Sequence, residues 1–202
     1  MDFINDGKES LMHDFSQILH QIDALLGEKD TVLVAIDGPC TAGKTTLAAY
    51  LAQTYSCNVF HMDEFFLQSF QRTPERLAEP GGNVDYQRFS QEILLPLTRG
   101  ETVCYRPYDC STQSLKAPIT VPHRKLSIIE GTYSCHPCFG DVYDLRIYLT
   151  VSPEIQRQRV LQRPAFKHQR FFTEWIPREQ QYFEAFQIRK SCGIVCSTQE
   201  AL

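Results

Sequence analysis

The sequence predicts an α/β fold of three layers, in which a five-stranded parallel sheet is covered by helices on both faces. Short apolar runs alternate with segments of helical periodicity along most of the 202 residues, as expected where parallel strands are joined by crossover helices. A glycine-containing loop follows the first apolar run and opens a helix. With 43% hydrophobic and 22% charged residues, the composition is that of a globular protein, and the length fits one domain spanning residues 1–202.

The core strands are expected where apolar runs end in polar or turn residues. Such runs lie at residues 31–36, 57–62, 126–131, 145–151 and 193–196. Helical spacing of apolar residues predicts helices at 9–26 (Leu11, Phe15, Ile18, Ile22, Leu25), at 45–55, around Phe89, Ile93, Leu94 and Leu97, at 153–163 and at 177–190. The first of these is an N-terminal packing helix within residues 1–28, and Gly27 is expected to cap its C-terminus.

Two further segments are expected outside this core. Residues 102–105 and 119–121 have the pattern of short strands that flank a long turn, so a hairpin insertion is expected over about residues 98–123. Ser152, followed directly by a proline and a glutamate, is a strong helix start. The segment from about 153 to 176 that begins there is expected to form a helical lid.

Residues 38–45 match the phosphate-binding loop pattern G-x-x-x-x-G-K-[ST]. The loop follows a buried strand and precedes a helix, which is the structural setting that the motif requires. We therefore expect a P-loop NTPase fold, in which Lys44 reaches the β- and γ-phosphates of a nucleotide and the Thr45 hydroxyl binds Mg²⁺. The nucleotide phosphates are expected to contact Gly38, Pro39, Cys40, Thr41, Ala42, Gly43, Lys44, Thr45 and Thr46.

Two carboxylates follow the second and third predicted strands directly. Because ligands gather at the carboxyl ends of parallel strands, Asp63 and Glu130 are expected at the same edge as the phosphate loop. We expect Asp63 to be catalytic and, together with Thr45 and Glu130, to bind the metal. The alternative for Asp63 is the N-cap of a helix over residues 64–66. Gly131 stands where a second acid would follow in a motor ATPase, and the absence of an Asn-Lys-x-Asp motif disfavours GTPases.

Basic residues cluster after the fourth predicted strand. Arg159 and Arg163 are four positions apart and share a helix face, with Arg157, Lys167 and Arg170 nearby. Phosphoryl transfer depends on neutralising charge, so Arg159 and Arg163 are expected to act from a lid that hinges near the proline at position 164. The alternative is a solvated helix face whose ion pairs contribute little.

Net charge and hydropathy indicate which classes of partner to expect. A net charge of −4 gives no reason to expect nucleic-acid binding. No apolar run approaches the about 20 residues that span a bilayer, and the acidic N-terminus is unlike a signal peptide. We therefore expect a cytoplasmic protein that acts on a small molecule, away from membranes; a homo-oligomer stays open. Among the eight cysteines, Cys135 and Cys138 have C-x-x-C spacing, but no second pair follows at zinc-ribbon distance, so reduced thiols are favoured over a zinc site.

Several blocks together resemble the uridine kinase and phosphoribulokinase-type family of P-loop kinases, over about residues 30 to 196. The blocks are GPCTAGKTT, VFHMDEFF, GGNVDYQRF, YRPYD, IIEGTYSCHP with YDLRIYL, and RQRVLQR with the later WIPREQQYF. The resemblance implies phosphorylation of a small-molecule hydroxyl by ATP and Mg²⁺, without a covalent phosphoenzyme.

The resemblance also implies residue roles. Asp63 matches the acid that accepts the hydroxyl proton, and Glu130 matches the metal-side carboxylate. The acceptor side is implied at Asp85, Tyr105, Arg106 and Tyr108, and the lid at Arg159 and Arg163. The sequence departs from the family at Gln113, near where uridine kinases carry a histidine that reads the pyrimidine, and at Cys40-Thr41-Ala42, where Ser-Gly-Ser is common.

Three functions follow from the sequence. The first is a nucleoside kinase that converts uridine or cytidine to the 5′-monophosphate. The second is a kinase of the same build for another alcohol, such as pantothenate, nicotinamide riboside or a sugar phosphate; an arginine aimed into the pocket would favour an anionic acceptor. The third is a nucleotide-dependent switch or ATPase, which would turn over ATP without any acceptor and would tolerate loss of Asp63.

Overall fold

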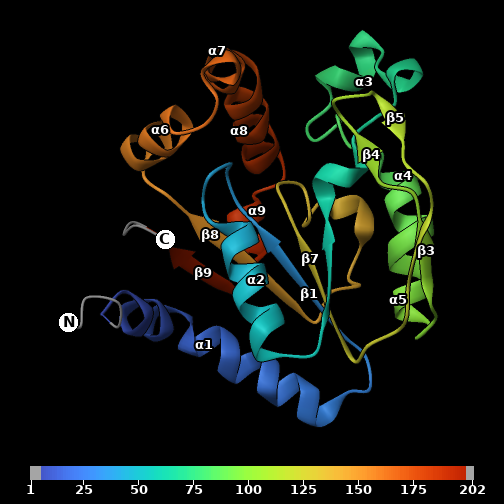
Figure 1. The fold of residues 1–202 in the computed structure, drawn as a ribbon, viewed down its shortest axis with the longest axis vertical. Coiled ribbons are helices and arrows are strands. Elements are labelled where there is room, and N and C mark those ends of the chain that lie inside the picture. Colours follow the sequence, from blue (N-terminus) through green and yellow to red (C-terminus); the bar gives the residue numbers. More distant parts are fainter. Residues whose placement is uncertain (1–5, 199–202) are drawn as a thin grey trace.

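The computed structural model describes residues 6–198, with side chains from Phe15 onward. Its core is a five-stranded sheet in the order β2-β7-β1-β8-β9, in which every neighbouring pair is parallel (Figure 1). The strands are β1 (Val32–Asp37), β2 (Asn58–His61), β7 (Leu126–Glu130), β8 (Leu145–Thr150) and β9 (Ile194–Ser197). The predicted five-stranded parallel sheet is therefore confirmed, with strand ends shifted by at most one residue.

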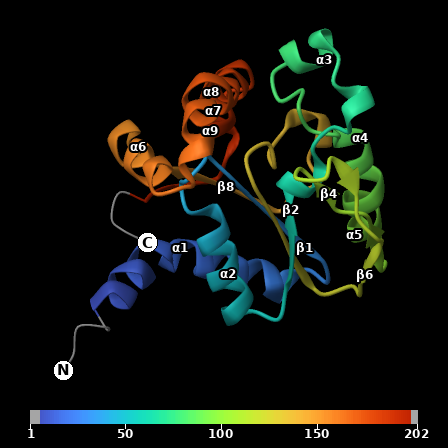
Figure 2. The ribbon, with the colours of Figure 1, turned by 45° about the horizontal axis from the view of Figure 1, so that its top comes forward.

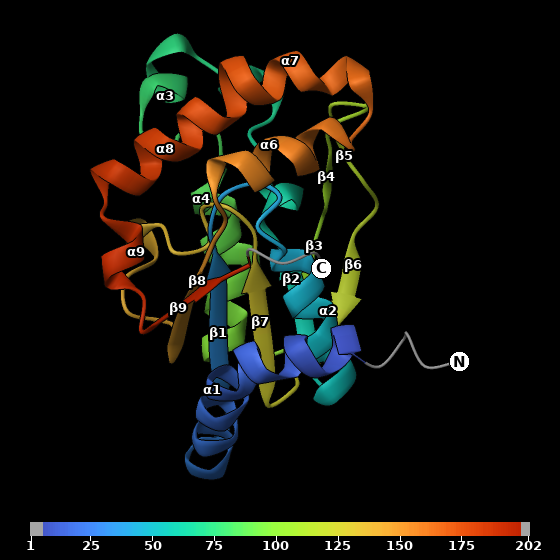
Figure 3. The same cartoon turned by 90° about the vertical axis from the view of Figure 1, so that its left-hand side faces the viewer.

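Helices cover both faces of the sheet, which confirms the three layers (Figure 3). Helices α1 (Asp6–Glu28) and α2 (Lys44–Thr54) pack on one face against alternate side chains of β1, such as Val34 and Ile36. The opposite face carries Leu33 and Ala35 and is covered by a second set of helical segments. These are α4 (Tyr86–Phe89), the π-helical η3 (Ser90–Leu94), α5 (Leu95–Thr98), α8 (Ile176–Ala185) and α9 (Ile188–Ser191).

The N-terminal helix is longer than predicted. Helix α1 continues to Glu28, so Gly27 lies inside it and the prediction of a Gly27 C-cap is wrong. A side chain at Gly27 would meet nothing within 4 Å, and its backbone is not among the left-handed glycines. Phe15, Ile18 and Ile22 are buried as expected, whereas Leu11 lies outside the residues whose side chains are described.

The C-terminal helices differ from their predicted limits. Helix α6 (Pro153–Leu161) begins at the predicted cap, where the Ser152 side chain accepts the Ile155 N–H, but it ends before Arg163. The predicted helix over residues 177–190 is broken, because Gln187 has a left-handed backbone (φ 50°) between α8 and α9. Helix α8 also begins earlier. It continues a helical rod formed by η5 (Ala165–Lys167), α7 (His168–Arg170) and the π-helical η6 (Phe171–Trp175), visible along the top of Figure 3.

The hairpin insertion is present outside the main sheet, as predicted. Strand β3 (Val103–Tyr105) pairs antiparallel with β6 (Ile119–Val121), and β4 (Tyr108–Asp109) pairs with β5 (Ser114–Leu115). Beside it lies the excursion after β2, made of η1 (Met62–Phe65), η2 (Ser69–Gln71) and α3 (Pro74–Ala78). Figure 2 shows these segments on the opposite side of the molecule from α6 and α7.

No helix within residues 6–198 has both the length and the apolar character needed to cross a membrane.

Candidate active site

The phosphate loop leaves the sheet at the end of β1 and enters α2 at Lys44. Gly38 has φ 140°, and a Cβ there would lie 2.4 Å from the Leu149 carbonyl oxygen on β8, so only glycine fits. Thr41 (φ 62°) and Gly43 (φ 87°) have left-handed backbones. Such alternation turns successive N–H groups toward one side and creates an anion-binding concavity. The loop is therefore shaped for phosphate by its backbone.

The Lys44 ammonium group is held against this loop. The residue is 8% exposed, and its Nζ donates to the carbonyl oxygens of Gly38 (2.8 Å) and Pro39 (2.9 Å) and to Thr132 Oγ1 (3.2 Å). All three acceptors are neutral oxygens. The positive charge of Lys44 is therefore not cancelled by these contacts and can act on a bound anion.

Glu130 joins the phosphate loop to the neighbouring strand. Its Oε1 accepts a hydrogen bond from Thr45 Oγ1 (3.0 Å) and lies 2.6 Å from His61 Nδ1. The three residues meet because β2, β7 and β1 are adjacent and end at the same edge. Glu130 is 5% exposed. Its hydrogen bond raises the pKa of His61 above the usual value of 6.5.

Asp63 lies two residues beyond His61, at the same edge. Its side chain remains accessible to solvent, yet partial burial first, and the nearby charge of Glu130 second, raise its pKa above the usual 3.8. The alternative reading of Asp63 as an N-cap is wrong, because η1 begins at Met62, its N-cap is His61 and Asp63 lies inside it. An accessible carboxylate with a raised pKa is suited to accept a proton.

The oxygen atoms at this edge suit a hard cation. Mg²⁺ prefers oxygen ligands and is commonly bound by one or two carboxylates together with the phosphates of a substrate. Thr45 and Glu130 already share a hydrogen bond of 3.0 Å, and the Asp63 carboxylate is close enough to Glu130 for their charges to interact. The donor set of the predicted metal residues therefore fits Mg²⁺.

Helix α6 forms the other wall of the nucleotide side. A cleft of about 600 Å³ lies between α6 and the loop, lined by Thr41, Gly43, Lys44, Thr45, Thr46, Ile155, Gln158, Arg159, Gln162 and Arg163. The Arg159 guanidinium donates to the carbonyl oxygens of Thr41 (2.9 Å) and Thr198 (2.9 Å). Arg159 thus fastens α6 to the loop, while Arg163 lies further along the same cleft. The predicted arginines both line the cleft.

The predicted acceptor residues are engaged in contacts within the fold, and none of them lines the cleft beside α6. The Tyr105 hydroxyl donates to Glu64 (2.7 Å), and the Tyr108 hydroxyl accepts from Arg72 (3.2 Å). The Arg106 guanidinium donates to carbonyl oxygens of its own hairpin, so it is directed away from the phosphate loop. Asp85 is buried; it caps α4 and accepts from the Gln71 amide (2.8 Å).

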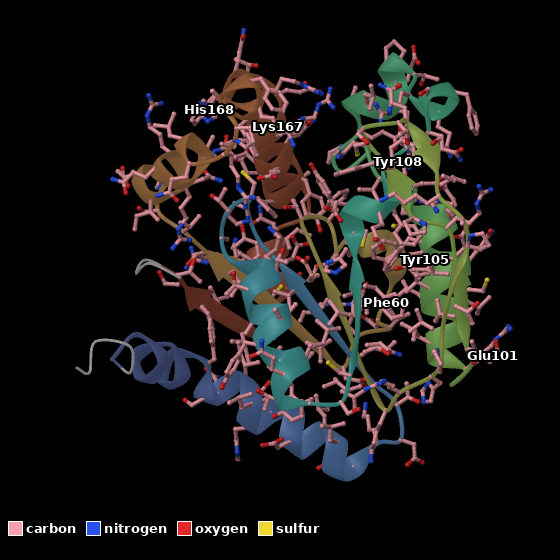
Figure 4. All side chains as sticks on the ribbon, in the orientation of Figure 1. Phe60, Glu101, Tyr105, Tyr108, Lys167 and His168 are labelled. Carbon is pink, nitrogen blue, oxygen red and sulfur yellow. The ribbon has the colours of Figure 1, made fainter. Side chains whose placement is uncertain are left out.

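The region around Cys110 on the hairpin contains charged groups from the lid and from the segment after β2. Burial raises the pKa of the Cys110 thiol, which follows β4 directly, and Arg72, Asp63 and Lys167 are all close enough to influence it. Figure 4 shows Tyr108 on the hairpin and Lys167 on the lid on opposite sides of this region.

The sequence analysis missed a buried carboxylate beneath the loop. Asp37 ends β1 and is fully buried, which raises its pKa. It accepts hydrogen bonds from the N–H groups of Gly38 (2.7 Å) and Cys135 (2.9 Å) and from the Tyr182 hydroxyl (2.9 Å). An acid at the end of a wholly apolar strand was the available signal. His61, Thr132 and Glu179 were also missed, because their partners are distant in sequence.

The C-x-x-C segment contributes to the hydrogen bonds around Asp37. The Cys135 backbone binds Asp37, and its thiol lies 3.9 Å from that of Cys192. All eight cysteines are free thiols. In the part of the chain that the structure describes, no group of His, Cys, Asp and Glu side chains has an arrangement that could hold a metal ion by itself.

No protein-family model matches the sequence, and no curated protein matches it. Solved structures do. One is described as a possible uridine kinase from Bacillus stearothermophilus, with a TM-score of 0.64 and 22% identity over 89% of this chain and 98% of that one. Another is described provisionally as a fructose transport system kinase from Silicibacter sp. TM1040, with a TM-score of 0.62 and 25% identity over 89% and 95%. A third is the YGR205w protein, with a TM-score of 0.51 and 12% identity over 90% and 83%.

These similarities define the class of fold. The chain has the three-layer α/β fold of P-loop kinases, and its expected resemblance to the uridine kinase-like members is confirmed at the level of the fold.

Proposed function

We propose that the protein is a single-domain kinase, spanning residues 1–202, that transfers the γ-phosphoryl group of ATP to a hydroxyl of a small molecule. One observation carries the proposal: the phosphate loop with Lys44, the Thr45–Glu130 pair and the accessible carboxylate of Asp63 lie at one edge of the sheet. Under this proposal the enzyme works in the cytoplasm, where ATP is supplied.

Phosphoryl transfer requires that the reacting groups be positioned and that the charge of the phosphates be neutralised. Different residues of the site would perform these two tasks. The loop amides and Lys44 hold the phosphates. Bound Mg²⁺ supplies further neutralisation of the phosphate oxygens, and Thr45, Glu130 and Asp63 are the side chains that would hold it. Asp63 also accepts the proton of the acceptor hydroxyl as the oxygen attacks, which makes that oxygen a better nucleophile.

The lid would supply the remaining positive charge. Arg163 lines the cleft beside Lys44 and Thr45, so its guanidinium is available to the transferring group. Arg159 is anchored to the loop carbonyl of Thr41 and would keep α6 in register with the loop. We assign charge neutralisation to Arg163 and positioning to Arg159.

A nucleoside is the first candidate acceptor. The support is the resemblance of the sequence blocks to uridine kinases, together with a similar fold in a protein described as a possible uridine kinase. Tyr105 and Tyr108 of the hairpin, whose hydroxyls contact Glu64 and Arg72, are the residues that we assign to the acceptor side. Uridine or cytidine would then be converted to the 5′-monophosphate.

Another alcohol is the alternative, and two observations favour it. Gln113 stands near the position of the pyrimidine-reading histidine, and its side chain accepts a hydrogen bond from Ser69 (3.2 Å). Asp85 is occupied as a helix cap. Pantothenate, nicotinamide riboside and sugar phosphates are the classes to compare, and the second similar structure is described as a fructose transport system kinase.

An acceptor screen tests the proposal. Release of ADP is measured by a coupled assay with ATP, Mg²⁺ and a panel of nucleosides, vitamins and sugar phosphates. We expect ADP release to depend on one class of acceptor. If ATP turnover is the same with every acceptor and with none, the kinase proposal is wrong and the protein is a nucleotide-dependent switch or ATPase.

A further inference from the structure

Glu179 on α8 places a carboxylate on the phosphate loop itself. The residue is 7% exposed, and its Oε2 accepts the backbone N–H of Cys40 at 2.9 Å. Its Oε1 lies 3.5 Å from Thr132 Oγ1, the hydroxyl that also contacts Lys44. A buried acid thus uses a loop amide of the kind that binds phosphate oxygens. The kinase mechanism proposed above assigns no role to Glu179.

The surroundings of Glu179 contain charges of both signs. Lys44 on α2 favours its ionised form, whereas Asp37 at the end of β1 disfavours it. The Cys40 thiol of the loop and the Tyr133 hydroxyl after β7 are also near it, and burial first, then the charge of Glu179, raises the pKa of both groups. Burial is the main reason why the pKa of Glu179 is raised. A second anion entering this region would increase that cost further.

We propose that Glu179 occupies the phosphate loop before the nucleotide and is displaced by the phosphates of ATP, so that nucleotide binding moves the N-terminal part of α8. This inference rests on the proposed function, because it requires ATP to bind this loop. One N–H group cannot serve two anions at full strength, and like charges placed side by side repel each other. Glu179 is therefore a positioning residue that opposes ATP and links the loop to the lid.

The helix that carries Glu179 is built to transmit such a displacement in one direction. Beyond Glu179, Tyr182 is bonded to the buried Asp37, which fixes that end of α8. Before Glu179, the rod changes to the π-helical segment η6 (Phe171–Trp175), and π-helical segments are often found at functional sites. Movement of Glu179 is thus passed toward the lid and its aromatic residue Trp175.

The substitution Glu179→Gln tests the proposal, because glutamine keeps an acceptor for the Cys40 N–H but removes the charge. We expect ATP to bind roughly tenfold more tightly by calorimetry, since a repulsion between like charges is lost. Adenosine, which carries no phosphate, should bind the variant and the wild type equally. Glu184→Gln, an exposed glutamate on the same helix, is the matched control and should change neither affinity.

A second measurement follows the lid directly. Trp175 is the only tryptophan of the chain, so intrinsic fluorescence reports on the segment before α8. We expect ATP to change this fluorescence in the wild type and adenosine to leave it unchanged.

The outcomes separate the two proposals. Absence of ATP binding to the wild type would remove the proposed function. Normal ATP binding with an unchanged or weaker affinity in Glu179→Gln, or with no fluorescence change, would overturn the role of Glu179 while the kinase proposal stands.

Discussion

A single oxygen of Glu130 connects the metal side of the site with the base side. Thr45 donates to Oε1 from the phosphate loop, and His61 approaches the same atom from β2. Asp63 follows His61 by two residues, and its pKa responds to the charge of Glu130. A ligand or ion that binds Glu130 therefore alters the protonation of His61 and of Asp63.

Removing the charge of Glu130 should lower the pKa of His61. The Glu130 hydrogen bond is the main cause of the raised pKa, so Glu130→Gln is expected to shift the His61 ring titration downward by NMR in the absence of Mg²⁺. The pair stabilises the fold fully below pH 6.5, the usual pKa of histidine, and this contribution is lost as pH rises through the raised value. Glu101→Gln, an exposed glutamate, should leave the titration in place. An unchanged His61 pKa in Glu130→Gln would contradict the assigned pair.

Asp63→Asn should leave ATP affinity nearly intact and reduce acceptor phosphorylation by at least roughly a hundredfold, because the general base is lost. In the wild type, activity should rise with pH through the raised pKa of Asp63, since only the ionised carboxylate accepts a proton. Steady-state kinetics across pH, with ATP binding measured separately, checks both. Undiminished turnover in the variant would exclude Asp63 from the mechanism.

The sequence predicted the residues whose role depends on a local motif or on strand order. Lys44 and Thr45 belong to one loop pattern, Asp63 follows β2 closely, and Glu130 ends β7. Their proximity at one edge follows from parallel topology. Asp37 and Tyr182 could not be paired in this way, because they are 145 positions apart and meet only through packing. The site roles assigned to these residues stay predictions.

At the scale of elements, α8 is fastened to the end of β1 by one buried hydrogen bond. Tyr182 is fully buried and donates to Asp37 at 2.9 Å. Tyr182→Phe removes the hydroxyl and leaves part of a buried carboxylate unsatisfied, which costs about 1–3 kcal/mol. Urea unfolding should show a loss of this size. Tyr55→Phe is the control, because the Tyr55 hydroxyl donates to Asp23 at an exposed position. An equally large loss of unfolding free energy in Tyr55→Phe would show that burial of the Tyr182 hydrogen bond is not what makes it important.

Element types were predictable because apolar periodicity is strong, whereas several element ends were not. Gly27 has the residue type of a C-cap, but the space around it is open and the helix continues. Gln187 has no breaker signature, yet its left-handed backbone separates α8 from α9. The π-helical segments at 90–94 and 171–175 have no sequence pattern of their own. Local residue preference is therefore too weak a signal to fix where these elements begin and end.

At the scale of the whole molecule, ligand binding and folding are coupled through the loop that joins β1 to α2. A ligand that binds only the folded state stabilises it by about 2.7 kcal/mol when present at 100 times its Kd. ATP with Mg²⁺ should therefore raise the melting temperature of the wild type by roughly 2–4 °C for each kcal/mol. Lys44→Ala should abolish most of this rise, because the loop loses the charge that faces the phosphates.

The control for this thermal measurement is Lys190→Ala, which changes an exposed lysine on α9. It should keep the full ATP-dependent rise. Melting temperatures are compared with and without ATP for each variant, so that any direct effect of losing the buried Lys44 on stability is subtracted. ATP stabilises the fold through the phosphate loop only if Lys44 holds the nucleotide. If ATP raises the melting temperature of Lys44→Ala as much as that of the wild type, ATP binds at another site on the molecule.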